Sequence, residues 1–205
     1  MKIVKLWKSI AGSAVLTLSL MHTPAMADVN FEGDPTVPIQ AQSILRGGFT
    51  FSSSNVGIRN DASGLGPSAV NGTNMLVFSD DSLLTITRAD HAHFSLSYFD
   101  VGGWGQIPVG SPGPLVVTGY SGAPTPLSLS IAFPRGSFVE GGVTTSLFTN
   151  LESLTMRIDG YPNKTVYVAI DNLVLTPVPE PETYALLLAG LGLLAVIGRR
   201  RKTLG

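Results

Sequence analysis

The feature that most constrains this fold is a succession of short runs in which apolar and polar residues alternate. Phe94, Leu96 and Tyr98, for example, are separated by single serines. A period of two places the apolar residues of a β-strand on one face and the polar residues on the other. Runs of this kind occur at residues 75–78, 83–87, 94–99, 115–120, 127–133, 151–158 and 165–175. They predict strands that each bury one face.

Pairs of turn-forming residues separate these runs, among them Gly102-Gly103, Gly141-Gly142 and Asp159-Gly160. No stretch of about ten residues between the two ends of the chain has a helical period. Seven or more short strands over about 150 residues predict an all-β, jelly-roll-like two-sheet sandwich. The stretch 52–73, rich in Gly, Ser and Asn, is expected to be a long loop at the rim.

The N-terminus has the three parts of a secretory signal peptide. These are Lys2, Lys5 and Lys8, then an apolar run near residues 10–21, then the small-residue site Ala25-Met26-Ala27. Cleavage by signal peptidase after Ala27 makes Asp28 the first mature residue. The alternative is a retained membrane anchor.

The C-terminus combines an extended polar motif, an apolar span and a basic stop. Pro177, Pro179 and Pro181 favour extended backbone, because proline fixes φ and restricts the residue before it. Residues 184–197 carry no charge, and the cluster 199–202 is basic. A transmembrane helix over about 184–198 is predicted, with the basic cluster on the cytoplasmic side. A short buried helix at the end of the domain is the alternative.

The run VPEPETYALLLAGLGLLAVIGRRRK, residues 178–202, resembles a PEP-CTERM sorting signal. Its Pro-Glu-Pro motif is Pro179, Glu180 and Pro181. The resemblance implies removal of the tail by an exosortase, a membrane-embedded cysteine protease of bacteria that make exopolysaccharide. It also implies delivery to the cell surface or the extracellular matrix. The chain thus divides into a signal peptide (1–27), a β-sandwich domain (28–177) and a sorting signal (178–205).

Removing both ends changes the charge of the protein. The whole chain has a net charge of −1, but six basic and twelve acidic residues remain in the domain, which is therefore about −6. An acidic domain argues against a nucleic-acid partner, since phosphate binding needs clustered Lys and Arg. The chain has no cysteine, which excludes disulfides, thiol catalysis and thiolate metal sites.

The domain also resembles secreted bacterial jelly-roll and carbohydrate-binding modules, through Phe31-Glu32 near its start and Ile170-Asp171-Asn172 near its end. The resemblance implies a structural calcium ion on Glu32 and Asp171, with backbone carbonyls completing the shell. The alternative is that Glu32 caps a turn and Asp171 accepts a backbone hydrogen bond. Trp104, among glycines, is the candidate for stacking on a sugar ring from an exposed loop; the alternative is a core position.

No catalytic motif stands out, so the chain is predicted not to be an enzyme. It has no Gly-x-Ser-x-Gly, no phosphate-binding glycine loop and no His-Glu-x-x-His. His91 and His93 at strand spacing could begin a metal site, but a solvated strand face is favoured. The sequence therefore predicts a non-enzymatic surface protein associated with an exopolysaccharide or biofilm matrix. A carbohydrate-binding module and a secreted glycan hydrolase are the alternatives.

Overall fold

The computed structural model describes residues 27–29, 31–32, 36–60, 69, 72–79, 82–105, 113–140, 142–159, 166–178 and 185–194. The described residues form eleven strands and one helix, at 185–194. The strands are β1 (Ala27–Val29), β2 (Val37–Arg46), β3 (Phe49–Arg59), β4 (Met75–Ser79), β5 (Leu84–Arg88), β6 (Phe94–Trp104), β7 (Leu115–Tyr120), β8 (Leu127–Ile131), β9 (Val143–Leu151), β10 (Ser153–Ile158) and β11 (Tyr167–Pro177).

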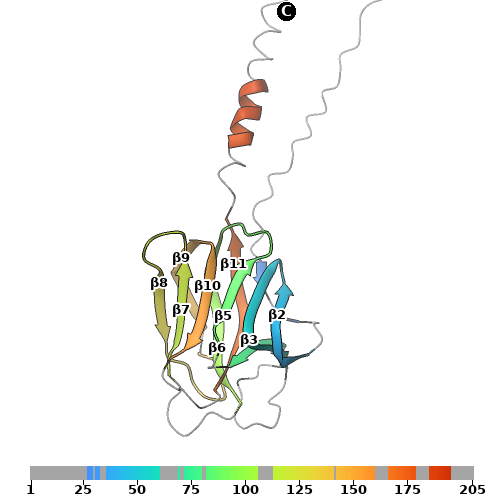
Figure 1. The fold of residues 1–205 in the computed structure, drawn as a ribbon, viewed down its shortest axis with the longest axis vertical. Coiled ribbons are helices and arrows are strands. Elements are labelled where there is room, and N and C mark those ends of the chain that lie inside the picture. The colour runs from blue at the N-terminus through green and yellow to red at the C-terminus, as the bar shows by residue number, and fades with distance from the viewer. Residues whose placement is uncertain are drawn as a thin grey trace, which may run out of the picture.

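The strands form two layers because β3 changes partner along its length. Residues 49–52 of β3 pair with β5, and residues 56–59 pair with β4. The first layer continues from β5 through β10 and β7 to β8, and the second continues from β4 through β11 and β6 to β9. β2 pairs with both halves of β3 and so lies along the corner. Figure 1 shows this arrangement, which is the predicted all-β, jelly-roll-like two-sheet sandwich.

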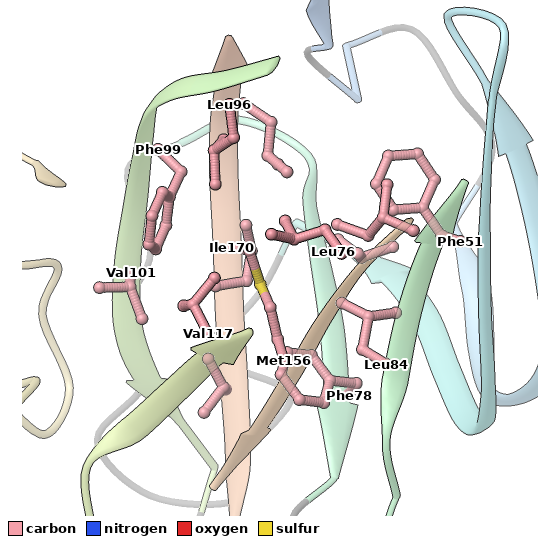
Figure 2. Close-up of a cluster of buried hydrophobic side chains, with 14 of the residues drawn as sticks. Phe51, Leu76, Phe78, Leu84, Leu96, Phe99, Val101, Val117, Met156 and Ile170 are labelled. Atoms are coloured by element: carbon pink, nitrogen blue, oxygen red, sulfur yellow. The ribbon is translucent and has the colours of Figure 1, made fainter. Parts of the chain in front are cut away.

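One face of each layer supplies the hydrophobic core, as the alternating pattern predicts. Leu84 and Met156 from the first layer meet Val101 and Ile170 from the second, and all four are fully buried. Figure 2 shows these side chains pointing from both layers into a common interior. Burying one such side chain stabilises the fold by about 1.5–3 kcal/mol, so the two layers hold each other in place.

β11 is an inner strand of the second layer. β6 pairs along one side of it. On the other side, β4 pairs with residues 167–170 and β1 pairs with residues 173–175. The pairing with β6 shifts register between Asp171 and Val174, and Asn172 there has a φ of 49°. This irregularity lies between the β4 and β1 segments and shapes the site described below.

All seven predicted runs coincide with observed strands, which are β4 to β8, β10 and β11. The rim loop expected over 52–73 is wrong for residues 52–59, which belong to β3. The turn expected at Gly102-Gly103 is also wrong, because both residues lie inside β6. A Cβ atom on Gly102 would overlap the carbonyl oxygen of Ser137, so this glycine permits a close approach of two backbones.

The helix at 185–194 lies within the predicted span 184–198. Among the described residues, no helix is both long and apolar enough to cross a membrane.

Candidate functional site

The outer face of the second layer carries two aspartates on neighbouring strands. Asp100 of β6 and Asp171 of β11 are direct cross-strand partners. Asp171 is 1% exposed and Asp100 is half-buried. Like charges placed opposite each other destabilise a sheet, so this pair needs hydrogen-bond donors around it.

Each oxygen of the two carboxylates accepts a hydrogen bond from the protein. The Tyr98 hydroxyl donates to Oδ1 of Asp100 at 2.6 Å, and the Asn172 side-chain amide donates to Oδ2 at 2.7 Å. The backbone N–H of Asn172 donates to Oδ1 of Asp171 at 2.8 Å, and the Thr73 hydroxyl donates to Oδ2 at 3.0 Å. We call these five residues the aspartate cluster.

Asn172 and Gly142 give the cluster its shape. Asn172 serves both carboxylates because its positive φ turns its backbone N–H and its side chain to the same site, and asparagine tolerates this conformation well. Gly142 has a φ of 65°, and a Cβ atom there would overlap the Tyr98 hydroxyl and the Asp100 carboxylate. The backbone at residue 142 therefore lies directly against the hydrogen bond between Tyr98 and Asp100.

The hydrogen bond to Asp100 raises the pKa of Tyr98 to about 12. Burial and the negative charge of Asp100 act in the same direction, since both disfavour the phenolate. Tyr98 is therefore a neutral donor at physiological pH, and it does not serve as a base there.

The structure places Glu32 and Asp171 in different environments. The Glu32 side chain is exposed, and its backbone carbonyl accepts a hydrogen bond from Arg46 at 2.8 Å. Both oxygens of Asp171 accept bonds from protein donors, which is the hydrogen-bonded alternative. A carboxylate oxygen has two lone pairs, so it can accept such a bond and also ligate a cation. Within the described ranges, there is no group of three or more His, Asp or Glu residues that could hold a metal ion. Calcium binding by Glu32 and Asp171 stays a prediction.

Trp104 is the last residue of β6 and is 1% exposed, so the exposed-loop position is wrong. Its ring contacts Tyr167 edge to face at a centroid distance of 5.6 Å, and the Arg59 guanidinium lies 5.7 Å from the ring centroid. Loop residues Ala69 and Phe138 join this small apolar cluster on the outer face. The ring is thus covered by the protein's own chain. The core position is the alternative interpretation of Trp104 that the sequence allows.

The two histidines do not share a strand face. Residues 89–93 form a turn and an irregular segment between β5 and β6, and His91 has a φ of 61°. The strand spacing predicted for His91 and His93 is wrong, because the chain reverses where the alternation suggested a strand. His93 instead lies 3.7 Å from the Glu152 carboxylate.

The processing sites fall mostly outside the described residues. Pro179, Glu180, Pro181 and Ala25 lie outside them, whereas Ala27 is the first residue of β1 and pairs with Leu175. The aspartate cluster was not predicted as a unit, although Asp171 was singled out. Its sequence signal is one aspartate in each of two strands that carry no other charged residue, and the pairing of β6 with β11 is needed to bring them together.

Comparison with known proteins adds information at the C-terminus. No curated protein matches the chain. One similar solved structure is described as an exo-beta-agarase, with a TM-score of 0.41 and 15% identity over 76% of this chain. This chain spans only 26% of the agarase chain. Another is TmCBM61 in complex with beta-1,4-galactotriose, with a TM-score of 0.37 and 10% identity over 63% of this chain and 88% of that chain.

The family model described as the PEP-CTERM protein-sorting motif matches residues 177–202. This is the segment in which the Pro-Glu-Pro motif, the apolar span and the basic cluster follow one another. The chain therefore carries a PEP-CTERM protein-sorting motif at its C-terminus.

Proposed function

We propose that this chain is an exported, non-enzymatic protein that an exosortase releases to the cell surface, where it associates with the exopolysaccharide of a biofilm matrix. The observation that carries the proposal is the sorting motif at residues 177–202. The signal-peptide pattern at 1–27 supports it independently, because export must precede processing of the tail. The apolar span then holds the protein in the inner membrane until the tail is cut.

The aspartate cluster supports a non-enzymatic role. Glycoside hydrolysis needs two carboxylates, one of which must be able to give up or accept a proton. Here Asp100 and Asp171 are hydrogen-bonded to Tyr98, Asn172 and Thr73 on all four oxygens. These bonds hold the two carboxylates in place between β6 and β11, which is a structural task.

A carbohydrate-binding module with one defined glycan is the alternative proposal. The two functions differ in ligand selectivity, which a glycan array measures on the purified protein. Retention of one defined glycan structure favours the module, and weak retention across a whole glycan class favours general association with the matrix. The Trp104→Ala variant tests the predicted stacking role, although the burial of this ring argues for a loss of stability instead.

Mass spectrometry of the mature protein tests the processing route. We expect a species that begins at Asp28 and ends near Pro181. A variant in which Glu180 is replaced by alanine should keep its tail, because the protease recognises the Pro-Glu-Pro motif. A mature wild-type protein that still contains residues 199–202 contradicts processing by an exosortase.

A further inference from the structure

The outer face of the first layer carries a row of hydroxyl side chains that crosses six strands. Each member is the direct cross-strand partner of the next. The row, which we call the hydroxyl row, is Ser43, Ser52, Thr85, Thr155, Thr118 and Ser128, from β2, β3, β5, β10, β7 and β8 in turn. Figure 1 shows these six strands side by side.

The row faces away from the core, because its neighbours along each strand are the core residues. Ile86 and Leu154, for example, adjoin Thr85 and Thr155 and are fully buried. Ser43 and Ser128, at the two ends of the row, are exposed. The other members are more buried: Ser52, Thr85 and Thr118 are half-buried, and Thr155 is 9% exposed. Adjacent strands are about 4.8 Å apart, so the hydroxyls repeat at about that distance.

Two further kinds of side chain flank the row. Tyr120, which is 42% exposed, follows Thr118 on the same face of β7 and is the cross-strand partner of Ser153. Arg157 is exposed and lies on the other side of the row, two residues after Thr155 on β10. The face thus combines hydrogen-bonding hydroxyls, an aromatic ring and a guanidinium.

The charge of this face differs from that of the domain. The six strands that carry the row contain no aspartate or glutamate. Six basic and twelve acidic residues between 28 and 177 make the domain about −6, so its carboxylates lie outside these strands, and exposed Glu152 and Asp159 directly flank β10. An anionic partner that lies along these six strands therefore meets fewer carboxylates than the net charge of the domain implies.

We propose that the hydroxyl row and its flanks bind an extended acidic polysaccharide whose chain runs across the strands. The inference rests on the proposed function, and it names the surface and the glycan class. The row spacing is close to the length of one sugar in an extended chain, so successive residues meet successive hydroxyls. Tyr120 offers a ring face for one sugar, and the Arg157 fork pairs with a uronic carboxylate. A flexible chain can also follow the twist of the sheet.

Affinity electrophoresis of the full-length protein in mild detergent tests this binding. The probes are alginate, a polymer of uronic acids, and carboxyl-reduced alginate of the same length. A triple variant, Thr85→Val with Thr118→Val and Ser128→Ala, removes three hydroxyls and should weaken alginate binding about tenfold or more. The matched control is Thr144→Val with Thr149→Val, which removes two exposed hydroxyls from β9 of the second layer and should bind like the wild type.

Arg157→Gln should weaken binding to alginate and leave binding to the carboxyl-reduced polymer unchanged. Equal wild-type binding of both polymers overturns the acidic specificity. A native protein that binds neither polymer, or a triple variant that binds alginate like the wild type, overturns the hydroxyl row as the site. Detection of the wild-type protein in the matrix fraction of the producing cells distinguishes this failure from a failure of the proposed function. If the wild-type protein is in that fraction, the proposed function stands without the row, and if it is absent, the proposed function fails too.

Discussion

At the scale of single residues, the second layer depends on a few side chains that do two tasks. Asn172 donates from its backbone to Asp171 and from its side chain to Asp100, and it does so from a left-handed conformation. Sequence reasoning found Asp171 and proposed a hydrogen-bonded alternative to calcium for it. It could not place Asp100 beside Asp171 and Asn172, because that contact depends on the register of β6 against β11, whereas the bond from Tyr98 to Asp100 is local to β6.

The raised pKa of Tyr98 gives a pH dependence with a definite sign. In the unfolded chain the phenol titrates at its ordinary pKa of 10.0, and in the folded protein at about 12. The folded state therefore holds this proton more tightly. Its stabilising contribution is complete below pH 10 and is lost as the pH rises toward 12.

Ultraviolet titration of phenolate absorbance measures this directly. We expect one tyrosine to titrate near pH 12 in the folded wild type and this component to be missing in Tyr98→Phe. The variant should also lose about 0.5–1.5 kcal/mol of stability, because Asp100 loses a donor. A component near pH 12 that persists in Tyr98→Phe would show that Tyr98 does not hold the late proton.

Calcium titration with thermal melting decides between the two interpretations of Asp171. If Glu32 and Asp171 bind calcium, saturation at a hundred times the dissociation constant should stabilise the fold by about 2.7 kcal/mol. The resulting rise in Tm should be absent in Asp171→Ala, and Asp90→Ala, at an exposed turn, is the control. A wild-type Tm that calcium does not change leaves hydrogen bonding as the role of Asp171.

At the scale of strands, β3 and β2 determine the architecture and were the hardest to predict. Strand β3 begins as the alternating Phe49 and Phe51 and then reads as a polar, glycine-containing stretch. Within that stretch, between residues 52 and 56, β3 passes from one layer to the other. By composition the stretch indicates a loop, although residues 56–59 pair with β4. Strand β9 was missed because it is an edge strand with irregular pairing and few buried residues.

At the corner, where β2 lies along β3, a small substitution should cause a large loss of stability. A Cβ atom on Gly57 would lie 2.6 Å from the carbonyl oxygen of Val37 and 2.8 Å from the nitrogen of Ile39, both backbone atoms of β2. Gly57→Ala should therefore push β2 off β3 and cost about 1–3 kcal/mol. Urea denaturation measures the loss, with exposed Ser54→Ala on the same strand as the control. Equal midpoints for the two variants contradict the close approach.

At the scale of the whole molecule, local signals were readable in the sequence and long-range ones were not. The sorting motif at 177–202 is a continuous segment, so its chemistry can be recognised without a fold. The alternating runs likewise specify the all-β class one strand at a time. The hydroxyl row, by contrast, joins residues between 43 and 155 through five separate strand pairings. Only the topology shows that these common surface residues form a line.

The pairing of β1 with β11 has a mechanical consequence. Ala27 lies opposite Leu175, and β1 runs antiparallel to β11, so the domain begins and ends at the same pole. A force on either end of the domain therefore acts where Ala27 lies opposite Leu175. Tension between the two ends would peel β1 from β11 one hydrogen bond at a time and would place no load across the sandwich. A load applied between the two ends is therefore borne by the pairing of β1 with β11, and the two broad faces of the sandwich stay unstressed.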